Sequence, residues 1–221
     1  MDAIKALVLR NNLKPGDSLP TESTLCKELG VSRSSVREAI RKLEALNIVS
    51  VEHGRGTFVG SLSLDPLVQT LTFRATLPGH GNFKALRDVV EVRRYIDLGC
   101  AEQVVSTFKG TQQPHLQQLV DQMIAQAEKK EMFLEQDIEF HLGLLSNLPN
   151  DIIKQLVQAL WLVHMAVIPQ IGLEIASELE PTAFAHQAIL DAAIDGDINA
   201  YRKAVIAHYE FLEEILDSHL K

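Results

Sequence analysis

The chain has 221 residues, a formal net charge of −8 at pH 7, and only two cysteines, Cys26 and Cys100. This length suits one small and one larger domain, and two distant cysteines in no metal or redox spacing indicate a reducing compartment rather than a disulfide scaffold. No apolar run reaches the length of a membrane span and no signal peptide opens the sequence, so we expect a cytoplasmic protein without a membrane partner.

Residues 19–59 are expected to form a helix, a tight turn, a second helix and a short hairpin. Thr21 is the expected N-cap of the first helix, and Gly30 ends it. Ser32 then caps a second helix that runs to about Asn47. Its apolar stripe comprises Val36, Ala39, Ile40, Leu43 and Leu46. A unit of this size is suited to placing its second helix in a DNA major groove.

The polar residues of the second helix favour contact with nucleic acid. Arg33, Arg37 and Arg41 are spaced i, i+4, i+8 and therefore lie along one side. An ordinary solvated face is the alternative for these arginines. Ser32, Ser34 and Ser35 crowd the N-terminal end, where hydroxyl groups and backbone amides can meet phosphates.

A hairpin is expected to follow the second helix. Ile48 to Val51 alternates like a strand, His53-Gly54-Arg55-Gly56 predicts a turn, and Thr57-Phe58-Val59 predicts the returning strand. A glycine-rich tip with one histidine and one arginine can enter a minor groove or follow a DNA backbone. An ordinary solvent-exposed hairpin is the alternative.

Residues 3–60 resemble the winged helix-turn-helix of the GntR family of bacterial regulators. The motifs that carry the resemblance are Leu19-Pro20-x-Glu22, Val31-Ser32-Arg33-x-x-x-Arg37-Glu38-Ala39, Leu43-x-x-x-x-Ile48 and Gly54-x-Gly56-Thr57-Phe58-Val59. The resemblance implies base contacts by Arg33 and Arg37. It also implies phosphate or base contacts by Ser32, Ser34 and Ser35, and groove contact by the wing tip at His53 and Gly54. Arg55, the arginine of that tip, completes the predicted DNA-binding set.

The chain departs from this family pattern at two positions. Ser23 stands where the family usually has arginine, and Thr24 stands where it usually has glutamate. The missing arginine normally joins operator reading, so we expect a different operator or a lower affinity. The missing glutamate removes the reciprocal half of a capping box at Thr21.

Charge is distributed unevenly along the chain. Residues 1–60 carry nine Lys and Arg against seven Asp and Glu, whereas residues 61–221 carry twelve against twenty-two. The acidic surplus therefore belongs to the second part of the chain, away from the expected DNA face. Because the positive balance of the first part is small, we expect a homodimer that gathers enough phosphate contacts on a near-palindromic double-stranded operator.

The rest of the chain predicts a mostly α protein whose second domain is an antiparallel helical bundle. We expect a DNA-binding domain at 1–60 with a small β-wing, a linker at 61–81 with a short helix around Leu67 to Phe73, and an effector-binding and dimerisation domain at 82–221. The expected helices of that domain are about 83–108, 114–130, 132–147, 151–168, 182–195 and 198–219. Short connections between them favour antiparallel neighbours.

A candidate metal site lies within the predicted bundle. Asp137 and His141 are four residues apart and share one helix face. Folding the last two helices as a hairpin about Gly196 brings His186 and His208 to roughly the same height. Three imidazoles and one carboxylate suit a divalent transition metal, with zinc expected first and nickel or manganese as alternatives.

Residues 82–220 resemble the effector-binding FCD domain of the FadR-type branch of the same family. The matching pieces are Glu91-Val92-Arg93, Asp137-x-x-x-His141, Asn150, His186-x-x-Ile189-x-x-Ala192 with Gly196-Asp197, and His208. The resemblance implies that Asp137, His141, His186 and His208 hold the metal and that Arg93 lies near the effector. Members that bind acyl-CoA lack the histidine set.

Asn150 and His164 complete the predicted effector site. For His164, a position on the bundle surface or at a dimer contact is the alternative. The sequence thus predicts a transcriptional regulator, a repressor, whose DNA affinity changes when a hydroxy, keto or sugar acid binds at the metal. The alternatives are a repressor that senses the metal itself, and a metalloenzyme. Two features argue against an enzyme. The chain carries a DNA-binding module, and no second acid–base group follows the candidate metal residues at a spacing that would bring it to the same site.

Overall fold

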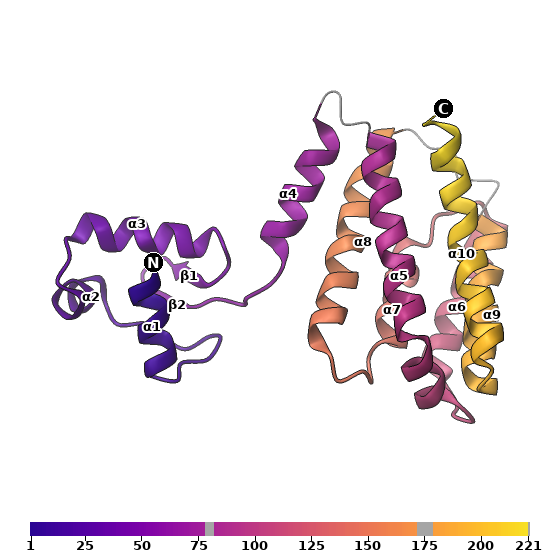
Figure 1. Cartoon of the computed structure of the whole chain (residues 1–221), viewed down its shortest axis with the longest axis horizontal. Coiled ribbons are helices and arrows are strands. Elements are labelled where there is room, and N and C mark those ends of the chain that lie inside the picture. Colours follow the sequence, from indigo (N-terminus) through magenta and orange to yellow (C-terminus); the bar gives the residue numbers. More distant parts are fainter. Residues whose placement is uncertain (78–81, 172–178, 221) are drawn as a thin grey trace. The chain divides into compact units, whose positions relative to one another are not determined.

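The computed structural model describes residues 1–77, 82–171 and 179–220, and the chain separates into two compact units, Met1–Leu67 and Val68–Lys221 (Figure 1). The predicted class is confirmed, since the described elements are helices apart from one two-stranded sheet. Part of the predicted linker, residues 78–81, lies outside the described residues. Its short helix is present but longer than expected, as α4 (Asp65–Thr76).

The first unit is a three-helix cluster with a β-hairpin. Its elements are α1 (Asp2–Arg10), α2 (Glu22–Leu29), α3 (Arg33–Glu44), β1 (Val49–Glu52) and β2 (Gly56–Val59). Their shared core comprises Ile4, Leu7, Leu19, Leu25, Val36, Ile40, Leu43, Val49 and Val59. Leu46 was expected in the apolar stripe of α3, but that helix ends at Glu44 and the Leu46 side chain is 47% exposed. The expectation failed because helical periodicity stops applying where the helix stops.

Local capping sets the turn between α2 and α3 as the sequence predicts. Thr21 Oγ1 accepts a hydrogen bond from Thr24 N, and Gly30 ends α2 in the left-handed conformation with φ of 66°. Ser32 Oγ accepts from Ser35 N at the start of α3. These caps satisfy backbone groups that a short helix cannot pair internally.

The wing is an antiparallel hairpin in which Val49 pairs with Val59 and Glu52 pairs with Gly56. Leu19 N in the segment before α2 donates to Thr57 O at 2.8 Å, and Gly60 N donates to Ile48 O at 2.9 Å across the base of the hairpin. Because β1 also packs against α3, the hairpin is held beside that helix.

Gly60 is closely approached by the backbone of a neighbouring segment. A Cβ atom built there would lie 2.3 Å from Asn47 O, which is backbone and cannot swing aside. We expect Gly60→Ala to lower the free energy of unfolding by about 1–3 kcal/mol, the usual range for overpacking. Urea unfolding followed by circular dichroism measures this. Gly99→Ala is the control, because a Cβ there meets nothing within 4 Å; equal stability of the two variants would contradict the expectation.

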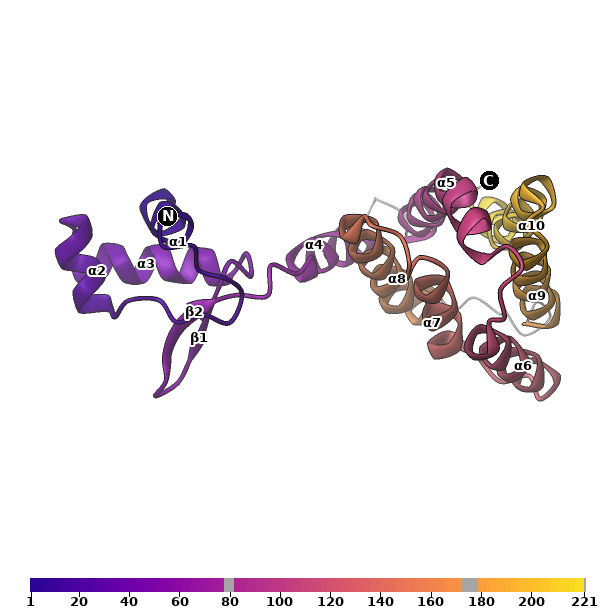
Figure 2. The ribbon, with the colours of Figure 1, turned by 90° about the horizontal axis from the view of Figure 1, so that it is seen from below.

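The helices of the second unit form a closed ring. Beyond α4 they are α5 (Asn82–Phe108), α6 (Pro114–Glu128), α7 (Leu134–Leu144), α8 (Asp151–Ile171), α9 (Leu179–Asp195) and α10 (Ile198–Ser218). Seen end-on, α5 contacts α8 on one side and α10 on the other, and the ring continues through α9, α6 and α7 (Figure 2). Each predicted helix is present within a few residues of its expected bounds.

The expectation that no segment is long and apolar enough to span a membrane is wrong for α8. Within α8, the 18 residues Asp151–Ile168 are long and apolar enough to cross a bilayer by length and composition, which the sequence analysis had denied. In the structure this helix packs against α5 and α7, and Val157, Val163 and Val167 lie in the bundle core. Burial of one face in the core accounts for part of its apolar character, since 44% of that window is buried.

Candidate metal centre and DNA-contacting face

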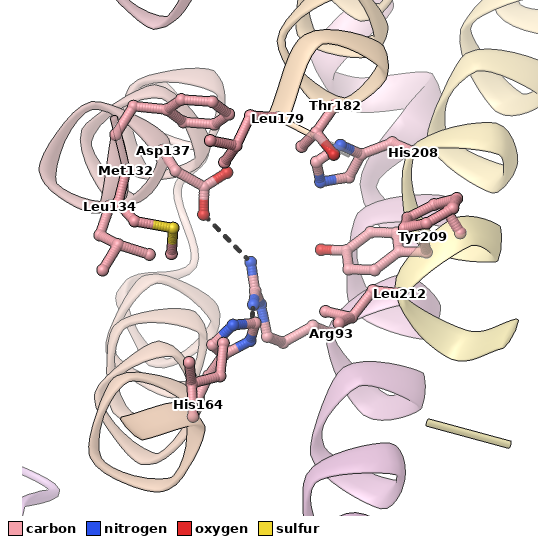
Figure 3. Close-up of a pocket in the computed structure, with 13 residues that line it drawn as sticks. Arg93, Met132, Leu134, Asp137, His164, Leu179, Thr182, His208, Tyr209 and Leu212 are labelled. Atoms are coloured by element: carbon pink, nitrogen blue, oxygen red, sulfur yellow. Dashed lines mark hydrogen bonds and ion pairs between the residues drawn. The ribbon is translucent and has the colours of Figure 1, made fainter. Parts of the chain in front are cut away.

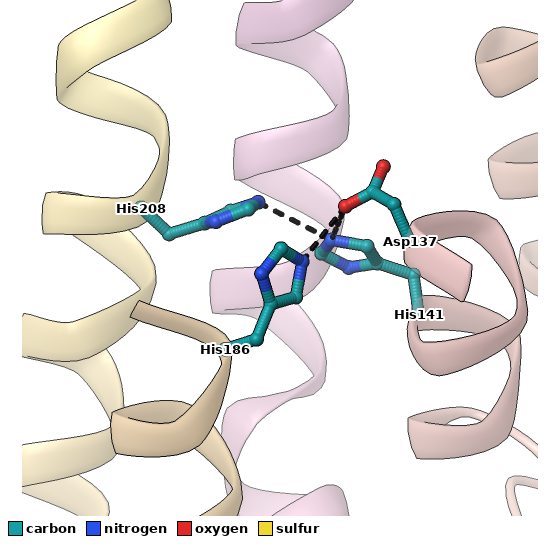
Figure 4. Close-up of side chains that lie close together, drawn as sticks. All are labelled: Asp137, His141, His186 and His208. Carbon is teal, nitrogen blue, oxygen red and sulfur yellow. Dashed lines mark hydrogen bonds and ion pairs between the residues drawn. The ribbon is translucent and has the colours of Figure 1, made fainter. Parts of the chain in front are cut away.

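Four potential metal ligands converge inside the bundle. Asp137 and His141 come from α7, His186 from α9 and His208 from α10, and one ligand atom of each lies within 4.8 Å of the others (Figure 4). All three histidines are buried. The i, i+4 spacing on α7 and the hairpin between α9 and α10 therefore bring the predicted set together.

The spacing of these atoms suits a single small cation. His186 Nε2 lies 2.7 Å from Asp137 Oδ1, His141 Nε2 lies 3.6 Å from the same oxygen, and the Nε2 atoms of His141 and His208 are 3.3 Å apart. Ligands held at the bond lengths of zinc are separated by about 3.0–3.4 Å in octahedral or tetrahedral geometry. The Nε2 atoms, not the Nδ1 atoms, form the candidate ligand cluster.

Further side chains orient two of the ligands. His186 Nδ1 lies 2.8 Å from the carbonyl oxygen of Thr182, and Trp161 Nε1 donates to Asp137 Oδ2 at 2.7 Å. Trp161 thus occupies one carboxylate oxygen and leaves Oδ1 for the cluster. Such outer contacts fix the ring orientation and tautomer of a metal-binding histidine.

His141 is oriented by an aspartate that the sequence analysis did not identify. His141 Nδ1 lies 3.2 Å from Asp97 Oδ2, an ion-pair distance at an angle outside good hydrogen-bond geometry. Asp97 also accepts a hydrogen bond of 2.6 Å from Tyr209, whose pKa is raised well above 10.0 by burial and by that carboxylate. The sequence did contain a signal for this role: Asp97 follows Arg93 by four residues and therefore lies on the same face of the same helix.

His186 supplies a test of whether a cation fits. Its two ring nitrogens both lie close to oxygen acceptors, Thr182 O and Asp137 Oδ1. A neutral imidazole has one N–H and can donate to only one of them. A second proton on the ring would resolve the conflict, and so would a divalent cation held by Nε2 and Oδ1, with which the donor set is therefore compatible.

Electrostatics hold two of the ligands, Asp137 and His208, in their metal-binding forms. Burial alone raises the pKa of Asp137, but the hydrogen bond with His186 and the charges of His141 and Arg93 outweigh burial and hold it well below 3.8. Burial and the neighbouring histidines hold the pKa of His208 well below 6.5. The carboxylate is therefore ionised and His208 is neutral near neutral pH, as metal ligation requires.

A small cavity adjoins the cluster. Its volume is about 80 Å³, and Arg93, Asp137, His164, His208 and Tyr209 contribute its polar lining (Figure 3). Apolar residues complete the wall, among them Met132, Phe133, Leu134, Ile168, Leu179 and Leu212. This volume is well below the roughly 300–1,000 Å³ of pockets for drug-sized ligands, so the cavity suits a molecule of few atoms.

Arg93 and His164 form a buried pair at the cavity wall. Arg93 donates from a terminal nitrogen to His164 Nδ1 at 2.9 Å and lies 3.9 Å from Asp137 Oδ2. Burial and the Arg93 charge lower the pKa of His164 to about 3, so the ring stays neutral and accepts this bond. The structure thus brings His164 to the cavity and not to the bundle surface.

Asn150 does not join this site. It is exposed just before α8, and its Oδ1 accepts hydrogen bonds from the backbone nitrogens of Ile152 and Ile153. The predicted effector contact is therefore not supported, and the position of Asn150 is explained by helix capping.

The candidate DNA face lies on the first unit. Arg33 and Arg37 project from α3 with side chains 67% and 57% exposed, and both are bound by Glu22 of α2. Ser32, Ser34 and Ser35 gather at the start of the same helix, with Ser32 Oγ 2.8 Å from Ser34 Oγ. The arginines and serines therefore share one accessible helix end.

The wing tip is also accessible. His53, Gly54 and Arg55 are exposed, and Gly54 has a φ of 77°, which favours glycine. Arg55 pairs with Glu52 and lies over the ring of Phe58, 5.5 Å from its centre. The arginine side chain is thus held against its own hairpin.

Family models match both parts of the chain. Residues 1–59 match the model described as bacterial regulatory proteins, gntR family, and residues 88–211 match the FCD domain. The second match alone covers more than half of the chain. FCD domains often bind a metal, in agreement with the Asp and His cluster.

Individual relatives span almost the whole chain. The galactonate operon transcriptional repressor of Escherichia coli (strain K12) is 25% identical over 199 residues, covering 90% of this chain and 87% of the relative. The HTH-type transcriptional regulator LutR of Bacillus subtilis (strain 168) is 25% identical over 219 residues, covering 97% and 98%. The solved Streptococcus agalactiae GntR aligns with a TM-score of 0.68 at 24% identity over 97% of both chains, which supports the fold. The chain therefore belongs to the GntR family of bacterial transcriptional regulators, with an FCD domain of the FadR type, and is a regulator rather than an enzyme.

Proposed function

We propose that this regulator is a dimeric repressor whose DNA affinity changes when a small carboxylate binds beside a metal ion held by Asp137, His141, His186 and His208. The observation that carries the proposal is the cluster of four ligand atoms within 4.8 Å, which opens onto the cavity lined by Arg93. When bound, the ion supplies positive charge and open coordination positions for an oxygen ligand.

The charge of the cavity supports an anionic effector. Arg93 is only 3% exposed, and its Nε has no hydrogen-bond partner within the described residues. A carboxylate entering the cavity would gain a charge-assisted contact with this guanidinium, and the low volume favours a small acid over a fatty acyl chain. The 2.9 Å hydrogen bond from the Arg93 guanidinium to His164 Nδ1 fixes the position of the guanidinium in the cavity wall.

The names of two relatives support the same chemical class. One similar protein is a galactonate operon repressor, and another, 27% identical over 226 residues, is a putative L-lactate dehydrogenase operon regulatory protein of Escherichia coli (strain K12). Galactonate is a sugar acid and lactate is a hydroxy acid. We therefore expect the effector of this chain among hydroxy, keto or sugar acids, and a catabolic operon as its target.

Binding of the best such acid is expected to depend on the metal. Calorimetry on the full chain, titrated with lactate, glycolate, pyruvate, citrate and aldonic acids, measures affinity before and after chelation. We expect Arg93→Ala to weaken binding of the best acid, and chelation to weaken it further, since each removes one positive partner of the carboxylate. The control is Arg94→Ala, because Arg94 pairs with Glu213 and does not line the cavity.

Two outcomes would contradict this proposal. Equal affinity with and without metal would show that the ion has no part in effector binding. A change in DNA affinity produced by the metal alone, with no acid bound, would instead favour the second candidate, a metal-sensing repressor. By linkage, the effector should change DNA affinity by ~5–150-fold, the range typical of coupled sites.

A further inference from the structure

One carboxylate of the first unit binds both arginines of the candidate DNA face. Glu22 is the first residue of α2, a helix that packs against α3 (Figure 1). Arg33 Nε donates to Glu22 Oε2 at 3.2 Å, and Arg37 Nε lies 3.0 Å from both Glu22 oxygens. Three charged groups therefore act as a unit with a net charge of one instead of two.

The atoms used in these contacts leave the reading edge of each arginine free. Glu22 accepts hydrogen bonds from the Nε–H of both guanidinium groups, and within the described residues their terminal amino groups form no hydrogen bond with it. A bidentate contact with the O6 and N7 atoms of guanine can be made by the two terminal groups. Base reading is thus compatible with the Glu22 contacts.

Contact with a phosphate backbone is affected differently. Non-specific binding depends on the positive charge that neutralises phosphates, and Glu22 cancels half of the charge offered by Arg33 and Arg37. Ion pairs this exposed contribute little to stability, about 0–1 kcal/mol. Glu22 consequently matters less for folding than for competition between DNA sites.

We propose that Glu22 is a specificity-determining residue, which weakens binding to non-specific DNA and positions Arg33 and Arg37 for base contact. The inference rests on the proposed DNA face of α3. Its test therefore includes Arg37→Ala, which reports on that face independently of Glu22.

The test compares Glu22→Gln with Glu28→Gln in the full chain. Glu28 is exposed on the same helix and forms no ion pair with either arginine in the described part of the chain, so both variants lose one negative charge from α2. The probes are a random-sequence duplex and a duplex selected from a random pool by the wild-type protein. Fluorescence anisotropy across a salt series gives the affinity and its salt dependence.

For Glu22→Gln we expect tighter binding to the random duplex, with a salt slope steeper by about one and a further loss of roughly threefold in affinity between 50 and 200 mM salt. The preference for the selected duplex should fall, and the melting temperature should not change. A Glu22→Asp variant, which keeps the charge, should recover part of the preference. Glu28→Gln should behave like the wild type.

Three outcomes would count against these claims, and each has a different meaning. If Arg37→Ala loses affinity for the selected duplex but Glu22→Gln matches Glu28→Gln on both duplexes, the role of Glu22 is overturned and the DNA face stands. If Glu22→Gln weakens binding to the random duplex, Glu22 assists non-specific binding and the proposal is also overturned. If Arg33→Ala and Arg37→Ala both keep full affinity for the selected duplex, the DNA face itself is wrong.

Discussion

The double variant His186→Ala/His208→Ala is expected to lose the metal. The wild-type chain should carry about one divalent ion after purification, since four protein ligands converge on one position. Removing two ligands should weaken binding by more than the ~10–100-fold that follows the loss of a single outer-sphere partner. Elemental analysis after dialysis measures the occupancy. His115→Ala serves as the control, because His115 is exposed and, among the described residues, forms an ion pair with Glu139 and lies outside the ligand cluster.

Chelation of the wild-type protein should also destabilise the bundle, because the ion joins α7, α9 and α10. At a free metal concentration of ~100 times Kd, metal binding stabilises the folded chain by about 2.7 kcal/mol. For a chain of this size, that corresponds to roughly 5–10 °C in melting temperature. The double variant should show no such difference between metal-loaded and chelated samples. Full metal occupancy in the double variant would refute the assigned ligand set.

Acid should oppose metal binding in the same experiment. The pKa of His208 in the folded chain lies well below its ordinary 6.5, so unfolding lets this histidine take up a proton as the pH falls below 6.5. Stability of the chelated bundle is therefore expected to fall from that pH downward, because the unfolded chain binds more protons. Protons also compete with the ion for the imidazole nitrogens, so metal occupancy should fall in the same direction.

Arg33→Ala and Arg37→Ala should each weaken binding to the selected duplex by about 1–3 kcal/mol, the value of one bidentate base contact. Both side chains are exposed and lie off the apolar stripe, so the fold should survive. Gel shifts with the selected duplex measure the effect. Arg202→Ala provides a matched control, since Arg202 forms a comparable surface ion pair with Glu102 in the bundle.

Measuring the affinity of each variant for duplexes with single base substitutions is more informative than its affinity for the selected duplex alone. A base-reading arginine should lose discrimination at one position of the duplex, whereas a phosphate-binding arginine should weaken all sequences uniformly. Unchanged affinity in both variants would remove α3 as the reading helix. Ser23 replaces the family's usual arginine, and its hydroxyl lies 2.9 Å from Thr21 Oγ1, so we expect no base contact from that position.

Several features of this protein were determined by local sequence. Thr21, Gly30 and Ser32 set the ends of α2 and α3, because capping depends on groups only a few residues apart. The spacing of Asp137 and His141, and the hairpin about Gly196, likewise predicted the convergence of the ligand atoms. The sequence analysis assigned no element to residues 2–10, although Ile4 and Leu7 of α1 are buried, because nine residues give only a weak periodic signal.

Other features were decided by tertiary structure alone. Asp97 orients His141, and Trp161 occupies one oxygen of Asp137, across helices separated by dozens of residues. Glu22 reaches two arginines of the next helix, and Asn150 caps α8 instead of facing the cavity. Sequence periodicity states which face of a helix a residue occupies, but the crossing of helices decides what that face meets. The ligands could therefore be named from the sequence, whereas the partners that orient them required the packed bundle.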